Sequence, residues 1–105
     1  MLQGKMQAMP AFSFNINDMT VNIFNIPTAG EGHPKHVHNY DHVTAVHSGK
    51  ILVTTEKHGS FELTKDSPPV LFPKDEWHEL EALEDGTSFT NYFGLNANNQ
   101  TNLSE

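Results

Sequence analysis

The stretch "GEGHPKHVHNYDHVTAVHSG" holds five of the seven histidines of this 105-residue chain. His36 and His38 are two residues apart, so on a β-strand both side chains would leave the same face. His42 follows four residues later, and His78 lies much further along, in "FPKDEWHEL". Neutral imidazoles are good ligands for iron, nickel, zinc and copper and acceptable ones for manganese. The pattern predicts one divalent transition metal ion per chain, held by His36, His38, His42 and His78.

The residues around these histidines favour strands over a helix. The spacing from His38 to His42 would also suit one face of a helix, but Pro34 and the β-branched Val37 and Val43 oppose a helix there. We therefore expect a strand carrying His36 and His38, a tight connection at residues 39–41, and a second strand that begins at His42. The segment around His78 is expected to be another strand that follows a turn.

The rest of the chain has the same character. Short β-rich runs cover residues 20–26, 42–49, 50–56, 60–66, 69–73, 76–83 and 87–95, and Gly, Pro, Asn and Asp separate them. No segment keeps an apolar repeat at helical spacing over three turns. The predicted fold class is all-β, a single-domain sandwich or barrel. We expect an N-terminal segment at 1–11, the β-barrel domain at 12–95 and a mobile polar tail at 96–105.

Composition narrows the classes of partner. The chain has no cysteine, so disulfides, thiolate ligands and thiol nucleophiles are all excluded. Its formal charge of −7 opposes binding to nucleic acid or to an anionic membrane surface, since both need a basic patch. No run approaches the roughly 18 apolar residues of a membrane span, and the N-terminus lacks a secretory signal. A cytoplasmic protein with a small-molecule ligand is expected.

The intervals between these histidines and two glycines resemble the first motif of the cupin family. Gly30, five residues, His36-Val37-His38, three residues, His42, six residues and Gly49 reproduce every interval of that motif. The one departure is His42, which stands where the family usually has glutamate. Four neutral imidazoles would leave a divalent site at +2, whereas three histidines and a glutamate leave +1. The site is therefore expected to favour anionic ligands.

The second cupin motif is matched less fully. Pro73 and His78 keep its proline-to-histidine spacing, with Asp75 in the place of a glycine, and aspartate tolerates a left-handed turn. Ser67 and Ala82 replace the family's glycine and asparagine at its two ends. The resemblance implies a cupin double-stranded β-helix, or jelly-roll barrel, with the metal in its open mouth. Small one-domain cupins with a four-histidine manganese site are the nearest subgroup, and other branches bind iron, nickel, copper or zinc.

Side chains alternate between the two faces of a strand, so an even or odd distance from a ligand (the parity of a residue) predicts which face it occupies. Residues with the same parity as the ligands are expected to line a small, largely apolar pocket: Thr44, Val46, Leu80 and Ala82. The other three histidines are expected at the surface or in an interface, because His33 and His58 lie in turn sequences and His47 has the opposite parity to His42. Tyr40 and Asp41 are expected to be turn residues, with orientation of an imidazole as the alternative.

The sequence names no catalytic residue. It has no nucleophile elbow, no phosphate-binding loop and no carboxylate pair set for glycoside chemistry, so a bound metal would carry any reaction. The first hypothesis is a metal-dependent oxidoreductase of dioxygenase type that acts on a small chelating substrate. A non-redox isomerase or lyase and a binding or sensor module without catalysis are the alternatives. Because cupins commonly pair through the outer sheet face, where Val43, Ala45 and His47 are expected, a homodimer is also predicted.

Overall fold

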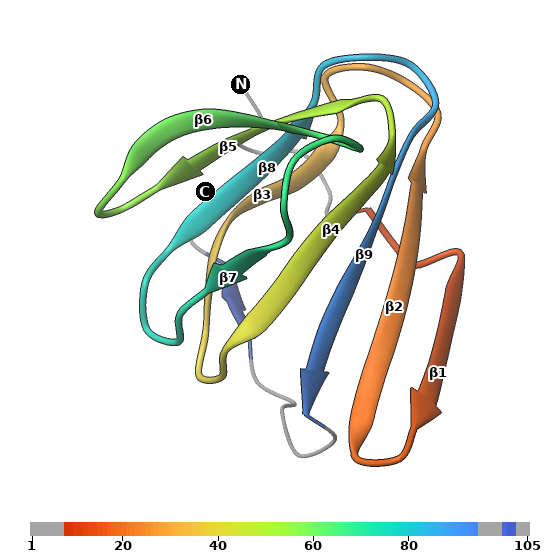
Figure 1. The fold of residues 1–105 in the computed structure, drawn as a ribbon. Helices are drawn as coiled ribbons and strands as arrows, with labels where there is room; N and C mark the ends of the chain where they lie inside the picture. Colours follow the sequence, from red (N-terminus) through yellow and green to blue (C-terminus); the bar gives the residue numbers. More distant parts are fainter. Residues whose placement is uncertain (1–7, 95–99, 103–105) are drawn as a thin grey trace.

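The computed structural model describes residues 8–94 and 100–102, and within them ten strands form two antiparallel sheets that face each other (Figure 1). The strands are β1 (Phe12–Ile16), β2 (Met19–Ile26), β3 (Gly32–His38), β4 (His42–Ser48), β5 (Lys50–Thr55), β6 (Gly59–Thr64), β7 (Val70–Phe72), β8 (His78–Ala82), β9 (Thr87–Gly94) and β10 (Gln100–Asn102). Within these ranges no helix has the length and apolar character needed to cross a membrane.

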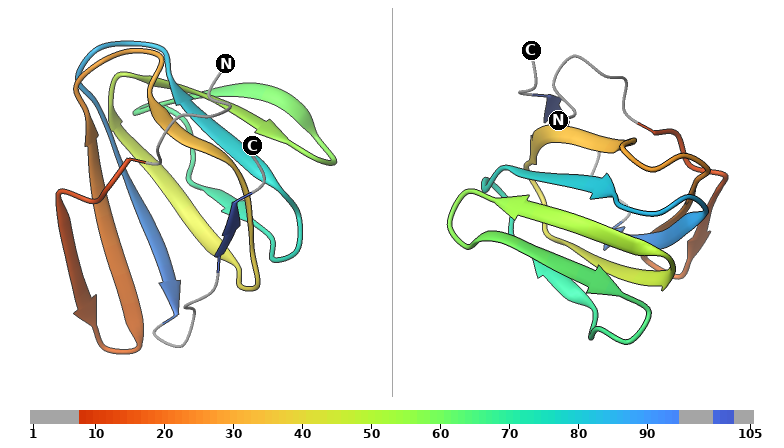
Figure 2. Two further views of the ribbon diagram at one scale, coloured as in Figure 1. Left: turned by 180° about the vertical axis from the view of Figure 1, so that it is seen from behind. Right: turned by 90° about the horizontal axis from the view of Figure 1, so that it is seen from above.

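The order of the strands is that of a jelly roll. One sheet runs β1-β2-β9-β4-β7 and the other β10-β3-β8-β5-β6. From β2 to β5, and again from β6 to β9, successive strands lie in alternate sheets. The chain therefore winds around a common interior (Figure 2). The prediction of an all-β double-stranded β-helix is confirmed.

The interior between the sheets is filled by apolar side chains, which alternate with outward-facing ones most regularly along β4, β5 and β8. The core consists of Phe24, Ile26, Val46, Ile51, Val53, Leu63, Phe72, Leu80, Ala82 and Phe89. Four of the five buried histidines lie beside this core, towards the turn between β3 and β4: His36, His38, His42 and His78. The core therefore supports one side of the histidine cluster directly.

Most predicted strands lie within about two residues of those observed, and two strands were not predicted. The strand, the turn at residues 39–41 and the strand that begins at His42 are confirmed by β3 and β4. The unpredicted β1 lies at an edge of its sheet and exposes every side chain, so its sequence lacks the burial signal of a strand. β10 lies inside the segment predicted to be a mobile tail, yet it pairs with β3 opposite His36, Val37 and His38 (Figure 2). The rest of that tail, like residues 1–7, lies outside the described residues.

Gly49, between β4 and β5, is required by a close approach of two backbones. Its φ is +75°, and a Cβ built there would lie 2.3 Å from Oγ1 and 2.7 Å from Cα of Thr87. Gly86 has a similar φ of +73° with nothing within 4 Å of a built Cβ. The left-handed conformation alone costs a non-glycine residue about 1–3 kcal/mol. We expect Gly49→Ala to lower the free energy of unfolding by more than Gly86→Ala, as measured by urea denaturation, and equal losses would contradict this account of Gly49.

Candidate metal centre

Three histidines from two paired strands converge in the barrel. His36 and His38 come from β3, and His78 comes from β8, directly opposite His36 in the register. All three are buried, and one ring nitrogen from each lies within 4.8 Å of the other two. The strand pairing therefore brings together residues that are about forty positions apart in the chain.

His42, the first residue of β4, completes the cluster from the other sheet. Its Nε2 lies 3.1 Å from Nε2 of His78, although His42 is outside the set of three whose donor atoms all lie within 4.8 Å of one another. Two imidazole nitrogens bound at about 2.1 Å to one ion, at right angles, would be about 3 Å apart. The distance between His42 and His78 thus suits two ligands of one ion.

Backbone carbonyls fix the orientation of two of these rings. Nδ1 of His36 lies 2.6 Å from the carbonyl oxygen of Pro34, and Nδ1 of His78 lies 3.4 Å from that of Glu76. A carbonyl oxygen can only accept a hydrogen bond, so each Nδ1 carries the proton. Nε2 of each ring is left with a free lone pair, which is the state a metal ligand needs.

The ring of His42 is oriented by a side chain. The hydroxyl of Thr44 donates to Oδ1 of Asn91 at 2.6 Å, so its oxygen can accept a bond from Nδ1 of His42, 3.4 Å away. His42 then also directs a lone pair from Nε2, and at 3.1 Å this lone pair faces that of His78. Two lone pairs in this arrangement repel each other unless a cation binds both. His38 adds a further unsatisfied atom, because its buried Nδ1 has no partner among the described residues.

Burial keeps the cluster uncharged. Desolvation, followed by repulsion from neighbouring histidines, lowers the pKa of His38 and of His78 to about 3 and the pKa of His42 to about 2. Burial also lowers the pKa of His36, against the opposing effect of its bond to the Pro34 carbonyl. Neutral imidazole is the form that coordinates metal, so the donor set fits a divalent transition ion.

The cluster opens into a small cavity of about 50 Å³, lined by Asn22, Phe24, His33, His36, His38, Tyr40, His42, Asn91 and Phe93. None of the four predicted pocket residues lines it. Val46, Leu80 and Ala82 face the interior as their parity requires, but they lie further along the strands and pack in the hydrophobic core. Thr44 is fully buried behind the cavity, bonded to Asn91. Parity gives the face of a strand correctly but not the depth along it, and the actual lining is more polar than expected.

His33 was wrongly predicted to be a surface or interface residue. It is 2% exposed, and its ring lies edge-on to Phe24 at a centroid distance of 4.4 Å. In the pairing with β8, His33 is opposite Leu80 and His36 is opposite His78. Between these two pairs β3 advances by three residues and β8 by only two, which is a β-bulge. Pro34 cannot donate a ladder hydrogen bond and lies within this irregularity. The bulge reverses strand parity, so His33 joins His36 and His38 inside the barrel; Pro34 was the only sequence signal of it.

The other two histidines lie outside the cluster, as predicted. His47 is exposed and hydrogen-bonds through Nε2 to the hydroxyl of Thr90, and His58 is exposed in the turn between β5 and β6. Tyr40, by contrast, does more than form a turn. Its ring lies 4.5 Å from that of His38 (centroid to centroid) in the cavity wall, and burial raises the pKa of its hydroxyl.

The turn before β8 is held by the two aspartates noted in the sequence. The Asp41 carboxylate accepts a bond from the backbone N–H of Lys74 at 2.8 Å, which is a turn role, as expected. Asp75 has a φ of +66°, the left-handed conformation that aspartate tolerates. Its backbone N–H donates to the carbonyl oxygen of His38 at 2.8 Å. These contacts tie the segment leading to His78 to the end of β3.

Comparison with known proteins rests on structure. No family model and no curated protein sequence matches the chain. An uncharacterized conserved protein with a double-stranded beta-helix domain from Klebsiella pneumoniae aligns with a TM-score of 0.74 and 15% identity, over 97% of this chain and 84% of that one. An RmlC-like cupin family protein from Methanocaldococcus jannaschii aligns with a TM-score of 0.66 and 18% identity, over 77% and 73%. The DMSP lyase DddQ from Ruegeria pomeroyi aligns with a TM-score of 0.70 and 16% identity, over 83% of this chain and 44% of that one. The two sheets, their strand order and these alignments together show that this chain has the cupin fold, a double-stranded β-helix.

Proposed function

We propose that this protein is a metal-dependent oxidoreductase of dioxygenase type, which acts on a small substrate that chelates the ion. The observation that carries the proposal is the distance of 3.1 Å between Nε2 of His42 and Nε2 of His78, beside His36 and His38. The ion is proposed to be manganese, iron or nickel, with zinc or copper as alternatives, because all of them accept imidazole nitrogen.

The charge of the site favours an anionic substrate. The four histidines are neutral, and no carboxylate or lysine lies among the residues that line the cavity. A bound divalent ion would supply Lewis-acid polarisation of a chelated group and, if it is redox-active, electrons for reaction with dioxygen. An anionic oxygen ligand such as a carboxylate or enolate would balance the otherwise unneutralised charge.

The cavity walls provide positions for hydrogen bonds but no strong base. Asn22, Tyr40 and Asn91 are the polar residues of the lining besides the histidines. Burial raises the pKa of Tyr40, so its hydroxyl remains protonated at neutral pH and acts as a donor. The amide oxygen of Asn91 already accepts a bond from Thr44, which leaves its NH₂ group for a ligand. These groups would orient a small oxygenated anion and stabilise negative charge on it.

Tyr40 favours a second candidate, a non-redox lyase or isomerase. A protonated hydroxyl beside His38 could donate a proton to a substrate whose enolate is stabilised by Lewis-acid polarisation, with no need for oxygen. The structural match to a DMSP lyase is compatible with this candidate, although the chain spans less than half of that protein.

Turnover with and without oxygen tests the two candidates. Protein loaded in turn with manganese, iron and nickel is assayed against small diketones, enols and hydroxy acids, with oxygen uptake and product formation followed together. The proposal expects product only in the presence of oxygen, with uptake proportional to product. Turnover that is unchanged by removal of oxygen would establish the second candidate instead. Binding without any turnover would leave a binding or sensor protein.

The residue that replaces the usual cupin glutamate allows a prediction about anion affinity. His42→Glu is expected to keep the metal, because a carboxylate is also a ligand, while it lowers the charge of the site by one. A negative charge about 4–5 Å from a bound anion should weaken azide binding by roughly tenfold or more, as followed by the spectrum of the cobalt- or iron-loaded protein. His58→Glu makes the same change in the exposed turn between β5 and β6, away from the cluster, and is the matched control. Equal azide affinities in the two variants would contradict the assignment of His42 to the site.

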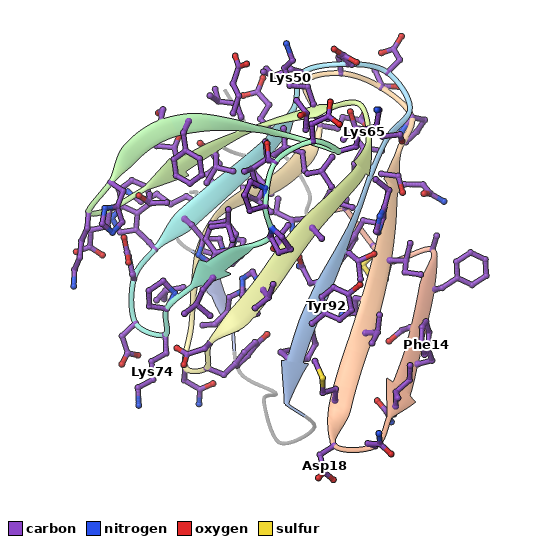
Figure 3. All side chains as sticks on the ribbon, viewed as in Figure 1. Phe14, Asp18, Lys50, Lys65, Lys74 and Tyr92 are labelled. Atoms are coloured by element: carbon purple, nitrogen blue, oxygen red, sulfur yellow. The ribbon has the colours of Figure 1, made fainter. Side chains whose placement is uncertain are left out.

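We also propose that a second copy of the chain covers the outer face of the sheet that contains β1. One row across the five strands of this sheet, set by the strand pairing, is Phe14, Val21, Tyr92, Val43 and Leu71 (Figure 3 labels Phe14 and Tyr92). The next row brings Phe12, Ile23, Thr90 and Ala45 together, so neither row contains a charged side chain. Phe12 and Leu71 are 63% and 58% exposed. Because each chain carries a charge of −7, an uncharged face such as this one lets two copies approach with the least repulsion.

Sedimentation equilibrium tests this surface. We expect a dimer that Phe14→Glu dissociates into folded monomers, because each interface would then bury two unpaired carboxylates. Ser60→Glu is the control, because Ser60 is exposed and lies on the other sheet, in β6. A wild-type protein that is monomeric at about 100 µM, well above the Kd of a stable dimer, would overturn the proposal.

A further inference from the structure

His33 is a fifth buried histidine, and the candidate metal centre does not use it. Its ring lies edge-on to Phe24 and Phe89, with centroid distances of 4.4 Å and 5.4 Å. It belongs to the lining of the same cavity as His36, His38 and His42. Its ring centroid is 6.0 Å from that of His36, and it is not among the three histidines whose donor atoms lie within 4.8 Å of one another. His33 therefore lies in the wall of the cavity rather than in the ligand set.

The hydrogen bonding of the ring determines which nitrogen is free. His33 hydrogen-bonds to the backbone of Ala8, and its Nε2 is buried without a partner among the described residues, so the bond to Ala8 involves Nδ1. The N–H of Ala8 already donates to the carbonyl oxygen of Gly32. The carbonyl oxygen of Ala8 is therefore the partner, and Nδ1 of His33 must carry the proton. This leaves Nε2 as a neutral acceptor.

A buried acceptor without a donor destabilises the protein unless something else satisfies it. Phe24 and Phe89, which pack on the ring, carry no donor group. No described residue supplies this donor, and His33 lines the cavity, so a ligand in the cavity is placed to supply it. A group that only accepts hydrogen bonds, such as a ketone oxygen or an ionised carboxylate, would leave Nε2 unsatisfied, whereas a hydroxyl would satisfy it.

We propose that His33 determines specificity in this site, with Nε2 accepting a hydrogen bond from a hydroxyl group of the bound chelator. The inference rests on the proposed function, since the histidine cluster and its ion would hold the chelating oxygens of that ligand. The substrate class is thereby narrowed to small hydroxylated anions, α-hydroxy acids or enols, in preference to the corresponding keto acids. A site that is built to hydrogen-bond a hydroxyl discriminates strongly against an analogue that lacks the donor.

Lactate and pyruvate are suitable probes, because both are three-carbon anions that chelate through a carboxylate and a second oxygen. Only the second oxygen of lactate carries a proton. Their Kd values are measured spectroscopically on cobalt-loaded wild-type protein and on His33→Phe, which keeps an aromatic ring against Phe24 and Phe89. The ratio of the two Kd values is compared between proteins, so that the intrinsic difference in chelation cancels. We expect the preference for lactate to fall by roughly tenfold in His33→Phe, with metal content, azide affinity and pyruvate affinity unchanged.

His47→Phe, a histidine-to-phenylalanine change on the outer surface, is the matched control and is expected to keep the wild-type ratio. A measurement on the wild-type protein avoids dependence on the folding of the variant. In the zinc-loaded protein with ¹⁵N-labelled histidine, lactate is expected to shift the Nε2 resonance of His33 and pyruvate is expected to leave it in place.

The failures of the two proposals are distinguishable. The role of His33 would be overturned if the ratio of the Kd values for lactate and pyruvate were the same in wild type and His33→Phe. It would also be overturned if lactate did not shift the Nε2 resonance of His33. Either result would leave the metal site intact. Loss of metal from His33→Phe would make His33 a ligand and would also overturn the proposed role. Failure of metal-loaded wild-type protein to bind either acid would overturn the chelating site itself, and this inference with it.

Discussion

Replacement of His78 is expected to weaken metal binding by at least roughly 100-fold, the largest effect of any single substitution in the cluster. His78 lies at the centre of the site. Its Nε2 is 3.1 Å from Nε2 of His42, and its donor atom lies within 4.8 Å of those of His36 and His38. Loss of a residue that merely orients a ligand typically costs 10–100-fold in metal affinity, so loss of a ligand should cost more. The measurement is a titration of the protein with zinc in competition with a chromophoric chelator.

The choice of substitution separates coordination from packing. The ring of His78 packs against that of Phe72 with a centroid distance of 4.7 Å, so alanine would leave a hole in a buried region and destabilise the protein by about 2–4 kcal/mol. His78→Phe fills the space and removes the nitrogen, and it is the variant of choice. His47→Phe, on the outer face, is expected to bind zinc as the wild type does. Wild-type affinity in a folded His78→Phe protein would remove His78 from the site.

Acid is expected to destabilise the metal-free protein well above the pH at which its carboxylates titrate. In the unfolded chain the histidines take up protons near pH 6.5, whereas burial lowers the folded pKa of His33, His38 and His78 to about 3 and that of His42 to about 2. Below pH 6.5 the unfolded state therefore binds more protons than the folded state. The free energy of unfolding must fall as the pH falls from about 7 towards 3, and each such histidine contributes about 1.4 kcal/mol per pH unit.

Urea denaturation of the metal-free protein at pH 7, 6 and 5 measures this dependence. The slope is expected to correspond to the uptake of at least two protons on unfolding. His58→Ala is the control, because His58 is exposed and its removal should leave the slope unchanged. Saturating zinc should raise the stability at every pH, because the ion binds the folded state. A free energy of unfolding that does not change between pH 7 and pH 5 would mean that the histidines are not buried in neutral form.

Features that depend on local sequence could be predicted. The β-branched residues around the histidines and the turn-forming residues 39–41 give β3, β4 and the turn between them, and with these the common orientation of His36 and His38. The second motif placed Asp75 where the family has a glycine, and its φ of +66° is the left-handed conformation that aspartate tolerates. Strand alternation also placed His47 correctly on the outer face.

Features that depend on long-range pairing could not be predicted. The burial of His33 follows from a bulge in the pairing of β3 with β8, and a strict two-residue alternation cannot include an irregularity of this kind. Val46 and Leu80 were placed on the correct face but in the wrong layer, since depth in the barrel depends on how far the two sheets diverge. β10 owes its strand structure to its partner β3 rather than to its own polar sequence.

The central claim is that the histidine cluster holds one divalent ion through nitrogen. X-ray absorption spectroscopy of the protein loaded with one equivalent of zinc or nickel tests this claim most directly, because the spectrum reports the type of donor atom and its distance. We expect at least three imidazole nitrogens at about 2.0–2.1 Å, with the outer-ring scattering that identifies histidine, and the loss of one of them in His78→Phe. A first shell made of oxygen atoms, with no imidazole scattering, would place the ion on the acidic surface and contradict the account.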